Sequence, residues 1–196
     1  MNLPNKLTLG RIALAFVFIV LLFLPGLWAK ILALVTFILA SATDLLDGYI
    51  AKKTGQITDF GRLMDPVADK ILILSAFVAF VQLQLVPAWM VVVIIFRDLA
   101  VSGLRALALA KGKVIAADSR GKHKTAVQAF AIFSILFLMI LREAPPRSLS
   151  FWSEGAEAAY KNAIFALMLV TVTLTLISGL SYLIKNREVY TNAKES

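Results

Sequence analysis

Four aspartates are spaced so that they could share one site. Asp44 and Asp47, and likewise Asp65 and Asp69, have the three- and four-residue spacings that place two side chains on one face of an α-helix. Four carboxylates together need compensating charge, which two divalent cations would supply. Oxygen-only ligands suit Mg²⁺ or Mn²⁺, and two such ions stabilise the attacking and leaving oxygens of a displacement at phosphorus. The aspartates therefore predict a two-metal site for phosphoryl-type transfer.

Small residues accompany these acids. Gly48 and Ala51 fall on the helical arc of the first acid pair, and Gly61 on that of the second. Where side chains are small, a ligand can approach the backbone closely. The alternative is structural: the acids are interfacial charges paired with nearby Lys and Arg, and the small residues tighten helix packing. The shared register on both helices favours a single site.

The composition places these residues in a membrane. Of the 196 residues, 60% are apolar and 16% charged, and the mean hydropathy is +0.83, whereas soluble domains are closer to half apolar. The chain contains no cysteine, which excludes disulfides and thiolate metal sites. With a net charge of +8, the expected partners are membrane lipids and anionic substrates. Nucleic acid is not expected, because no basic motif with stacking aromatic residues accompanies the charge.

Six apolar segments are long enough to span a membrane, for which a helix needs roughly 20 residues. They are expected at residues 8–27, 31–53, 60–84, 87–110, 124–142 and 158–185. Because they fill almost the whole chain, residues 1–196 are predicted to form one domain, with a solvent-exposed, flexible tail at 186–196. The predicted fold is all-α: a polytopic membrane protein of six transmembrane helices with a polar active-site cavity facing the cytoplasm.

Basic residues are sorted to one side of this predicted bundle. Most of the 20 Lys and Arg residues fall on the side of the N-terminus, and the opposite side holds Lys30, Arg142, Arg147 and Lys161. Since cytoplasmic loops of membrane proteins carry the excess of Lys and Arg, both termini and the active site are predicted to be cytoplasmic. The protein is expected in the cytoplasmic membrane. All the aspartates fall in the same half, which charge sorting does not require.

The acids are part of a longer pattern. The string Asp44-x2-Asp47-Gly48-x2-Ala51-Lys52-x8-Gly61-x3-Asp65-x3-Asp69 resembles the signature of the CDP-alcohol phosphatidyltransferase family, D-x2-D-G-x2-A-R-x8-G-x3-D-x3-D, at all fixed positions but one. Segments 3–11, 96–105 and 121–125 are similar to the branch of the family that makes phosphatidylglycerol phosphate. The resemblance spans residues 3–128, and the last helix adds only hydrophobicity.

The resemblance implies an enzyme that transfers the phosphatidyl group of CDP-diacylglycerol to glycerol 3-phosphate and releases CMP. It implies that Asp44, Asp47, Asp65 and Asp69 bind two Mg²⁺ or Mn²⁺ ions. Asp69 would also take the proton of the acceptor hydroxyl, whose oxygen attacks the β-phosphorus. It further implies contacts to CDP-diacylglycerol from Asn5, Thr8, Gly48, Ala51, Lys52, Thr58 and Gly61. Members of the family are typically homodimers, so a homodimer is expected.

Two positions depart from the family pattern. Lys52 stands where the family usually has Arg, so a two-pronged phosphate contact becomes a single point-charge contact. Asp98 replaces the Glu that commonly follows the arginine at position 97, which shortens the reach of that carboxylate.

An anionic acceptor needs a basic subsite beside the metals. Arg97 and Arg105 lie about 80° apart on one predicted helix, and Lys122 and Lys124 begin the next helix on the same membrane side. These four residues are predicted to bind the acceptor phosphate. Serine carries no phosphate and fits this subsite poorly, whereas inositol phosphate fits it by charge and remains an alternative acceptor.

A cation or proton-coupled transporter is the alternative from another class, because acids in membranes often mark ion pathways. The acids of this chain cluster at one predicted membrane side, and the sequence shows neither an inverted repeat nor a pair of broken helices. Both observations favour the lipid enzyme.

Overall fold

The computed structural model describes residues 3–54, 59–111, 120–144 and 154–191, and side chains at 8–43, 67–68, 70–111, 126–144 and 154–189. These ranges consist of helices joined by short turns. The helices are α1 (Leu3–Phe23), α2 (Leu27–Thr54), α3 (Asp59–Gln82), α4 (Ala88–Ala110), α5 (Arg120–Glu143), α6 (Glu154–Lys185) and α7 (Glu188–Thr191). The first six coincide with the six predicted segments, which confirms the all-helical fold.

The helix ends differ from the predicted ones by a few residues. The largest difference is at α1, which begins at Leu3 and therefore includes the polar residues Asn5 and Lys6. α6 begins at Glu154, and the two glutamates in its first turn suit the positive end of the helix dipole. The prediction located apolar stretches, whereas backbone hydrogen bonding continues into polar residues at both helices.

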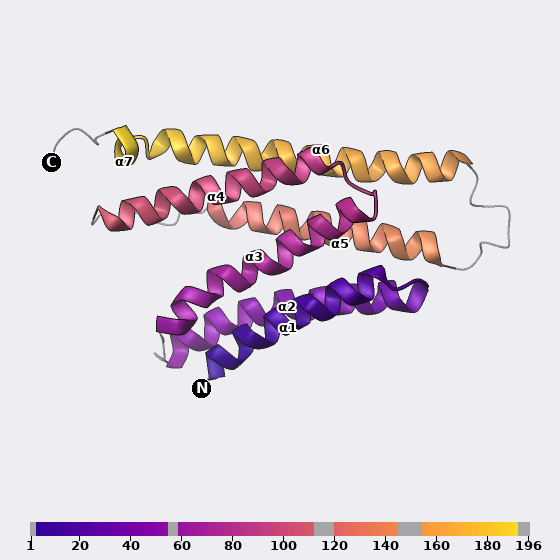
Figure 1. Cartoon of the computed structure of the whole chain (residues 1–196), viewed down its shortest axis with the longest axis horizontal. Coiled ribbons are helices and arrows are strands. Elements are labelled where there is room, and N and C mark those ends of the chain that lie inside the picture. Colours follow the sequence, from indigo (N-terminus) through magenta and orange to yellow (C-terminus); the bar gives the residue numbers. More distant parts are fainter. Residues whose placement is uncertain (1–2, 55–58, 112–119, 145–153, 192–196) are drawn as a thin grey trace.

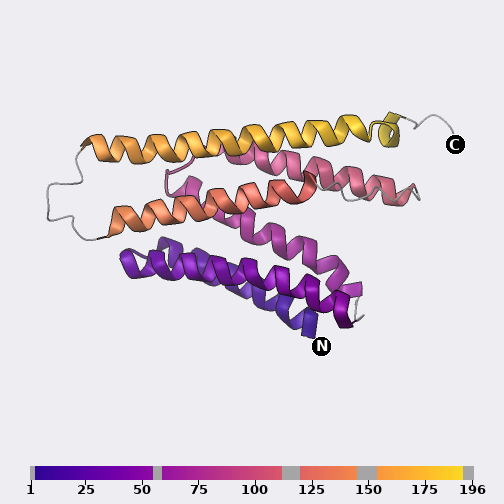
Figure 2. The same ribbon diagram turned by 180° about the vertical axis from the view of Figure 1, so that it is seen from behind.

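α3 crosses the molecule between two pairs of helices. α1 packs against α2 on one side, α4 packs against α6 on the other, and α5 contacts both α2 and α6 (Figure 1). The reverse view shows the same order, with α3 starting beside the end of α2 and finishing beside α4 (Figure 2). α1 begins, α2 ends, α3 begins and α7 lies at one end of the long axis, called here the N-terminal end.

A tight turn fixes α1 against α2 at the opposite, far end. Gly26 has a φ of 97°, a left-handed conformation that favours glycine, and the preceding Pro25 has no N–H to continue α1. The last carbonyl groups of a helix have no partner within the helix, and at α1 the buried Lys30 provides one. Its Nζ donates to the carbonyl oxygen of Leu22 and, at 2.9 Å, to that of Leu24. The lysine thus sets the register of α1 along α2.

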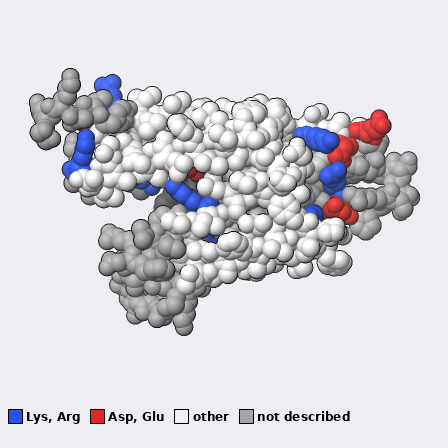
Figure 3. All heavy atoms as spheres, in the orientation of Figure 1, with Lys and Arg blue, Asp and Glu red and all other residues white. Residues whose placement is uncertain are grey.

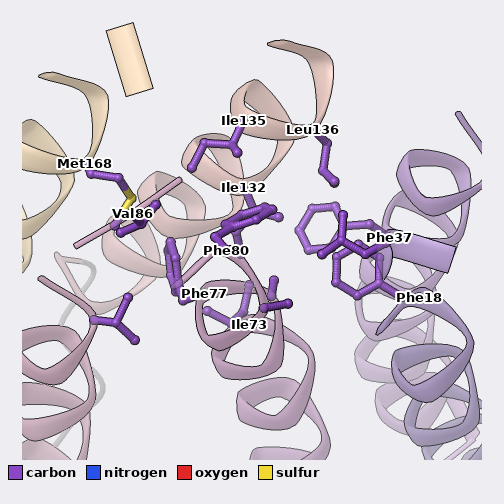
Figure 4. Close-up of a cluster of buried hydrophobic side chains, with 14 of the residues drawn as sticks. Phe18, Phe37, Ile73, Phe77, Phe80, Val86, Ile132, Ile135, Leu136 and Met168 are labelled. Atoms are coloured by element: carbon purple, nitrogen blue, oxygen red, sulfur yellow. The ribbon is translucent and has the colours of Figure 1, made fainter. Parts of the chain in front are cut away.

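The hydrophobic core lies halfway along the bundle. The rings of Phe18 on α1 and Phe37 on α2 are 5.8 Å apart between centroids and tilted by 46°. Figure 4 shows Phe80 of α3 beside Ile132 of α5, and Phe77 of α3 near Val86. α3 therefore contributes to the centre of the core, and this packing fixes the helix whose first turns carry two of the predicted acids.

Two helices of the described residues are long and apolar enough to cross a membrane: Ala126–Glu143 within α5, and Glu154–Lys185, which is α6. Shorter apolar stretches occupy Thr8–Phe23, Leu27–Thr43 and Lys70–Gln82. On the face drawn in Figure 3, charged atoms gather at the two ends, and the middle carries a group of Lys and Arg atoms in the hollow between the two halves. Red acidic atoms lie beside this group, and most of the surrounding surface in the middle of that face is uncharged, as expected for the predicted membrane location.

The chain beyond α6 is packed further than predicted. Val189 in α7 is buried with Val101 and Leu104 of α4, and its carbonyl oxygen accepts a hydrogen bond from Lys111 Nζ at 2.7 Å. This part of the predicted tail is therefore docked on α4 and is not a solvent-borne segment. Residues 192–196 lie outside the described residues.

Candidate active site

The acid-bearing segments meet at the N-terminal end of the bundle (Figure 1). Asp44, Asp47, Gly48, Ala51 and Lys52 fall in the last turns of α2, and Gly61, Asp65 and Asp69 in the first turns of α3. Their side chains lie outside the described residues, as does the whole of Thr58, which belongs to the connection at residues 55–58. The predicted contacts of these residues therefore remain predictions.

The helix register nevertheless bears on the acids. In two antiparallel helices joined by a short connection, positions equally far from the connection lie at the same depth. Counted from the centre of residues 55–58, Asp44 is level with Asp69, and Asp47 is nearly level with Asp65. The backbone thus provides two acidic levels about one helical turn apart at one end of the bundle.

This donor set fits divalent cations. Carboxylate oxygens at one depth on adjacent helices are the hard ligands that Mg²⁺ and Mn²⁺ prefer. Among the described side chains, no group of three or more His, Cys, Asp or Glu could hold a metal ion. The four aspartates lie outside that set and remain the residues proposed to hold the metals.

α1 contributes a polar residue to this end. Thr8 is fully buried, and α1 packs against α2 and α3, so Thr8 faces the two acid-bearing helices. A contact between Thr8 and the cytidine diphosphate part of the lipid stays a prediction, as does that of Asn5, whose side chain lies outside the described residues.

A lysine next to the last acid joins α3 to α4. Lys70 Nζ lies within hydrogen-bonding distance of Ser102 Oγ, and both side chains are partly buried. Because Lys70 directly follows Asp69, this bond ties the second acidic helix to the helix that carries the predicted acceptor arginines. The bond is one of the contacts that hold the start of α3 against α4.

Arg97 is buried inside the bundle with unused donors. Its side chain is 4% exposed, and Nη1 donates to Asp98 Oδ1 at 2.9 Å. Among the described residues, Nε and Nη2 of Arg97 are buried without a hydrogen-bond partner. Buried donors without partners are costly, and a guanidinium binds phosphate through paired N–H groups. These two nitrogens are therefore the donors of Arg97 that the described residues leave without a partner.

A glycine on α6 makes room for this arginine. A Cβ added at Gly179 would lie 2.6 Å from Arg97 Cγ and 2.9 Å from Arg97 Nε, closer than atoms tolerate. The arginine side chain therefore runs across α6 where that helix has no side chain. Asp98, predicted to have a short reach, holds the one nitrogen that faces it.

Arg105 is held by α6 as well. Its Nε donates to the hydroxyl of Tyr182 at 3.2 Å, and its Cζ lies 5.5 Å from the centre of the tyrosine ring. Both predicted arginines of α4 thus contact α6, Arg97 at Gly179 and Arg105 at Tyr182. Lys122 and Lys124 are in the first turns of α5, and their side chains lie outside the described residues.

Four residues of this region are not among the predicted site residues. Lys70 and Ser102 were absent from the predicted site, and α6, which supplies Gly179 and Tyr182, was expected to add only hydrophobicity. One signal was available: an isolated glycine within an apolar helix often marks a close packing contact.

The matches to known proteins cover almost the whole chain. A family model described as CDP-alcohol phosphatidyltransferase matches residues 1–186. A CDP-diacylglycerol--glycerol-3-phosphate 3-phosphatidyltransferase of Bacillus subtilis (strain 168) is 40% identical, with 95% of this chain and 96% of the relative covered. One of the same name from Rickettsia bellii (strain RML369-C) is 37% identical, with 92% and 93% covered. A probable phosphatidylglycerophosphate synthase of Mycobacterium tuberculosis (strain ATCC 25618 / H37Rv) is 36% identical, with 92% and 79% covered. On this evidence the chain belongs to the CDP-alcohol phosphatidyltransferase family.

Proposed function

We propose that this chain transfers the phosphatidyl group of CDP-diacylglycerol to sn-glycerol 3-phosphate, releasing CMP and forming phosphatidylglycerol phosphate. The observation that carries this proposal is the agreement between the placement of the aspartates and the names of the relatives. The aspartate pattern falls on the facing ends of α2 and α3, and relatives named for this reaction align with more than nine tenths of the chain. The reaction is a step in phospholipid biosynthesis.

The proposed enzyme is a single integral-membrane domain with six spans. α1 to α6 supply the six helices, and α1 begins at the same end at which α6 leads into α7. The excess of Lys and Arg at that end supports a cytoplasmic location for it and for the acids. The lipid substrate then reaches the site from the bilayer and the water-soluble acceptor from the cytoplasm. A homodimer is proposed because it is typical of the family.

In the proposed mechanism, Asp69 takes the proton of the acceptor hydroxyl, and the freed oxygen attacks the β-phosphorus of CDP-diacylglycerol. The new oxygen–phosphorus bond forms as the bond from that phosphorus to the bridging oxygen breaks, and CMP departs with the electron pair. Asp44, Asp47 and Asp65, together with Asp69, would hold two Mg²⁺ or Mn²⁺ ions. When bound, these ions offset the negative charge of the diphosphate and of the departing CMP. Lys52 is proposed to contact the cytidine diphosphate.

The acceptor subsite is proposed at α4 and the start of α5. The two unpartnered nitrogens of Arg97 would receive the phosphate of the acceptor, with Arg105, Lys122 and Lys124 adding positive charge. A phosphorylated alcohol brings the phosphate that this strongly basic subsite suits, and serine carries none. Charge alone does not separate glycerol 3-phosphate from inositol phosphate, and the names of the relatives favour glycerol 3-phosphate.

An acceptor screen on the purified full chain tests the proposal. CMP release from CDP-diacylglycerol is measured in mixed micelles with Mg²⁺ and glycerol 3-phosphate, inositol 1-phosphate, serine or no acceptor. We expect acceptor-dependent CMP with glycerol 3-phosphate and a lipid product of the mass of phosphatidylglycerol phosphate. Release with inositol phosphate alone would move the chain to the alternative acceptor. Folded protein that releases no acceptor-dependent CMP would overturn the proposed function.

A further inference from the structure

Arg11 is a buried cation that the proposed reaction leaves unused. Its side chain is 1% exposed and is among the largest fully buried side chains described. It belongs to a buried stripe on α1 that also holds Thr8, Ala15, Phe18 and Leu22, the three- and four-residue spacing of one helical face. α1 packs against α2 and α3, so this stripe faces those two helices. The arginine and the threonine are its polar members.

A buried guanidinium needs a nearby carboxylate or carbonyl oxygens to offset its desolvation, which costs several kcal/mol. Arg11 has a polar or electrostatic interaction within the chain. The acids on the helices that contact α1 are all aspartates: Asp44, Asp47, Asp59, Asp65 and Asp69. The described acids elsewhere lie on α4, α5, α6 and α7. The aspartates of α2 and α3 are therefore the acids on neighbouring helices that are available to compensate Arg11.

The register of the α1–α2 turn supports this assignment. Counted from its centre at Pro25, Arg11 is level with Leu39 on α2. Asp44 lies five residues further toward the N-terminal end, roughly 7.5 Å along the axis. Side chains on a helix lean toward its own N-terminus, and that of α1 lies at the acidic end. A long side chain at position 11 therefore leans toward the aspartates and covers most of this offset.

We propose that Arg11 is a built-in counter-cation of the aspartate cluster, which stabilises the acids before metal ions bind and weakens their hold on those ions. Arg11 is thus a positioning residue, and the inference rests on the proposed metal site. In the absence of metal, the arginine offsets part of the repulsion among the carboxylates. With two divalent ions present, the cluster is already neutralised and the arginine opposes the ions by like charge. The metals consequently remain exchangeable.

Arg11→Met tests the proposal through thermal stability and metal binding, without any activity measurement. In EDTA, we expect the Tm of the variant to fall below that of the wild type. In saturating Mg²⁺ we expect a smaller difference in Tm between the variant and the wild type. The rise in Tm that Mg²⁺ causes should therefore be larger in the variant than in the wild type. The dissociation constant for Mg²⁺ should decrease by about threefold or more, because one opposing charge is removed from the site. Arg11→Lys keeps the charge and should leave both quantities near their wild-type values.

Lys30→Met provides the matched control. Lys30 is also a buried cation, but it bonds to the carbonyls at the end of α1 at the far end of the bundle. Its loss should lower the Tm equally with and without Mg²⁺ and leave the metal affinity unchanged. If Arg11→Met behaves in the same way as this control, Arg11 is only a packing residue and the inference is wrong.

A second variant covers the case in which Arg11→Met fails to fold. Asp44→Asn added to Arg11→Met removes one negative charge from the cluster and should restore folding in EDTA, because arginine and aspartate are coupled. A double variant that also fails to fold would refute the coupling. The outcomes also separate this inference from the proposed function: if wild-type protein binds no Mg²⁺ at all, the metal site fails, whereas normal binding with no effect of Arg11 overturns the inference alone.

Discussion

Replacing Asp69 with asparagine is expected to abolish turnover, with a fall in kcat of at least about 10³-fold. Asparagine keeps the size of the side chain but cannot accept the proton of the acceptor hydroxyl and is a weaker ligand for Mg²⁺. General-base catalysis alone contributes about 10² to 10⁴-fold, and the loss of one metal ligand adds to this. CMP release per folded protein, with glycerol 3-phosphate as acceptor, is the measurement.

Asp59→Asn is the matched control for this variant. Asp59 begins the same helix, α3, but stands outside the aspartate pattern, so the same chemical change there should leave kcat within about twofold, as substitutions away from a catalytic site usually do. Size-exclusion profiles and the Tm show whether both variants fold. An Asp69→Asn protein with more than about a tenth of wild-type kcat would remove the assigned role of Asp69 as the base.

Arg97→Lys is expected to raise the KM for glycerol 3-phosphate by about 10²-fold while leaving the KM for CDP-diacylglycerol nearly unchanged. Lysine keeps the positive charge beside Asp98, so the buried pair is preserved. It lacks the two further nitrogens that are unpartnered in Arg97, and these are the donors proposed to bind the acceptor phosphate. Initial rates at varied concentrations of each substrate separate the two KM values.

Glycine variants on α6 and α4 sharpen this test without changing any charge. Gly179→Ala places a Cβ 2.6 Å from Arg97 Cγ, so the arginine has to move, and we expect a rise in the acceptor KM in the same direction. Gly103→Ala has no atom within 4 Å of the added Cβ and should be neutral. If Arg97→Lys lowers kcat and the Tm but leaves the acceptor KM unchanged, Arg97 supports the bundle and does not bind the acceptor.

The positions of the helices could be predicted because each apolar stretch carries its own signal. The acids and small residues of α2 and α3 were placed on facing helix ends by local spacing and by the shortness of the connection between them. The register counted from residues 55–58 agrees with this placement. Family resemblance supplied the roles of those residues, which spacing alone did not determine.

The contacts between distant helices could not be predicted in the same way. Arg97 packs at Gly179 and Arg105 bonds to Tyr182, pairs far apart in the chain, and one sequence does not state which faces of α4 and α6 meet. The docking of α7 depends on the same interface, because Val189 packs with α4 residues. The low hydropathy after α6 predicted a solvent-exposed tail, because an average over many residues does not detect one buried residue such as Val189.

A buried arginine and a buried lysine illustrate the same limit. Arg11 and Lys30 both read as charges that mark a membrane side, yet both are buried, and Lys30 bonds to the end of α1. Charge counts report on topology because they add up many residues. The role of a single charged residue depends on which acceptor groups of the neighbouring helix lie within its reach.

The central claim is that the aspartates of α2 and α3 act as one metal centre, and counting bound Mn²⁺ tests it most directly. Equilibrium binding to the purified chain, followed by electron paramagnetic resonance, gives the number of ions and whether they are magnetically coupled. We predict two ions per chain with a coupled spectrum, as expected for ions roughly 3.5–4 Å apart. Four single variants should each remove the coupling: Asp44→Asn, Asp47→Asn, Asp65→Asn and Asp69→Asn. Asp59→Asn should not. Coupled Mn²⁺ that survives all four substitutions, or no bound Mn²⁺ in the wild type, would contradict the account.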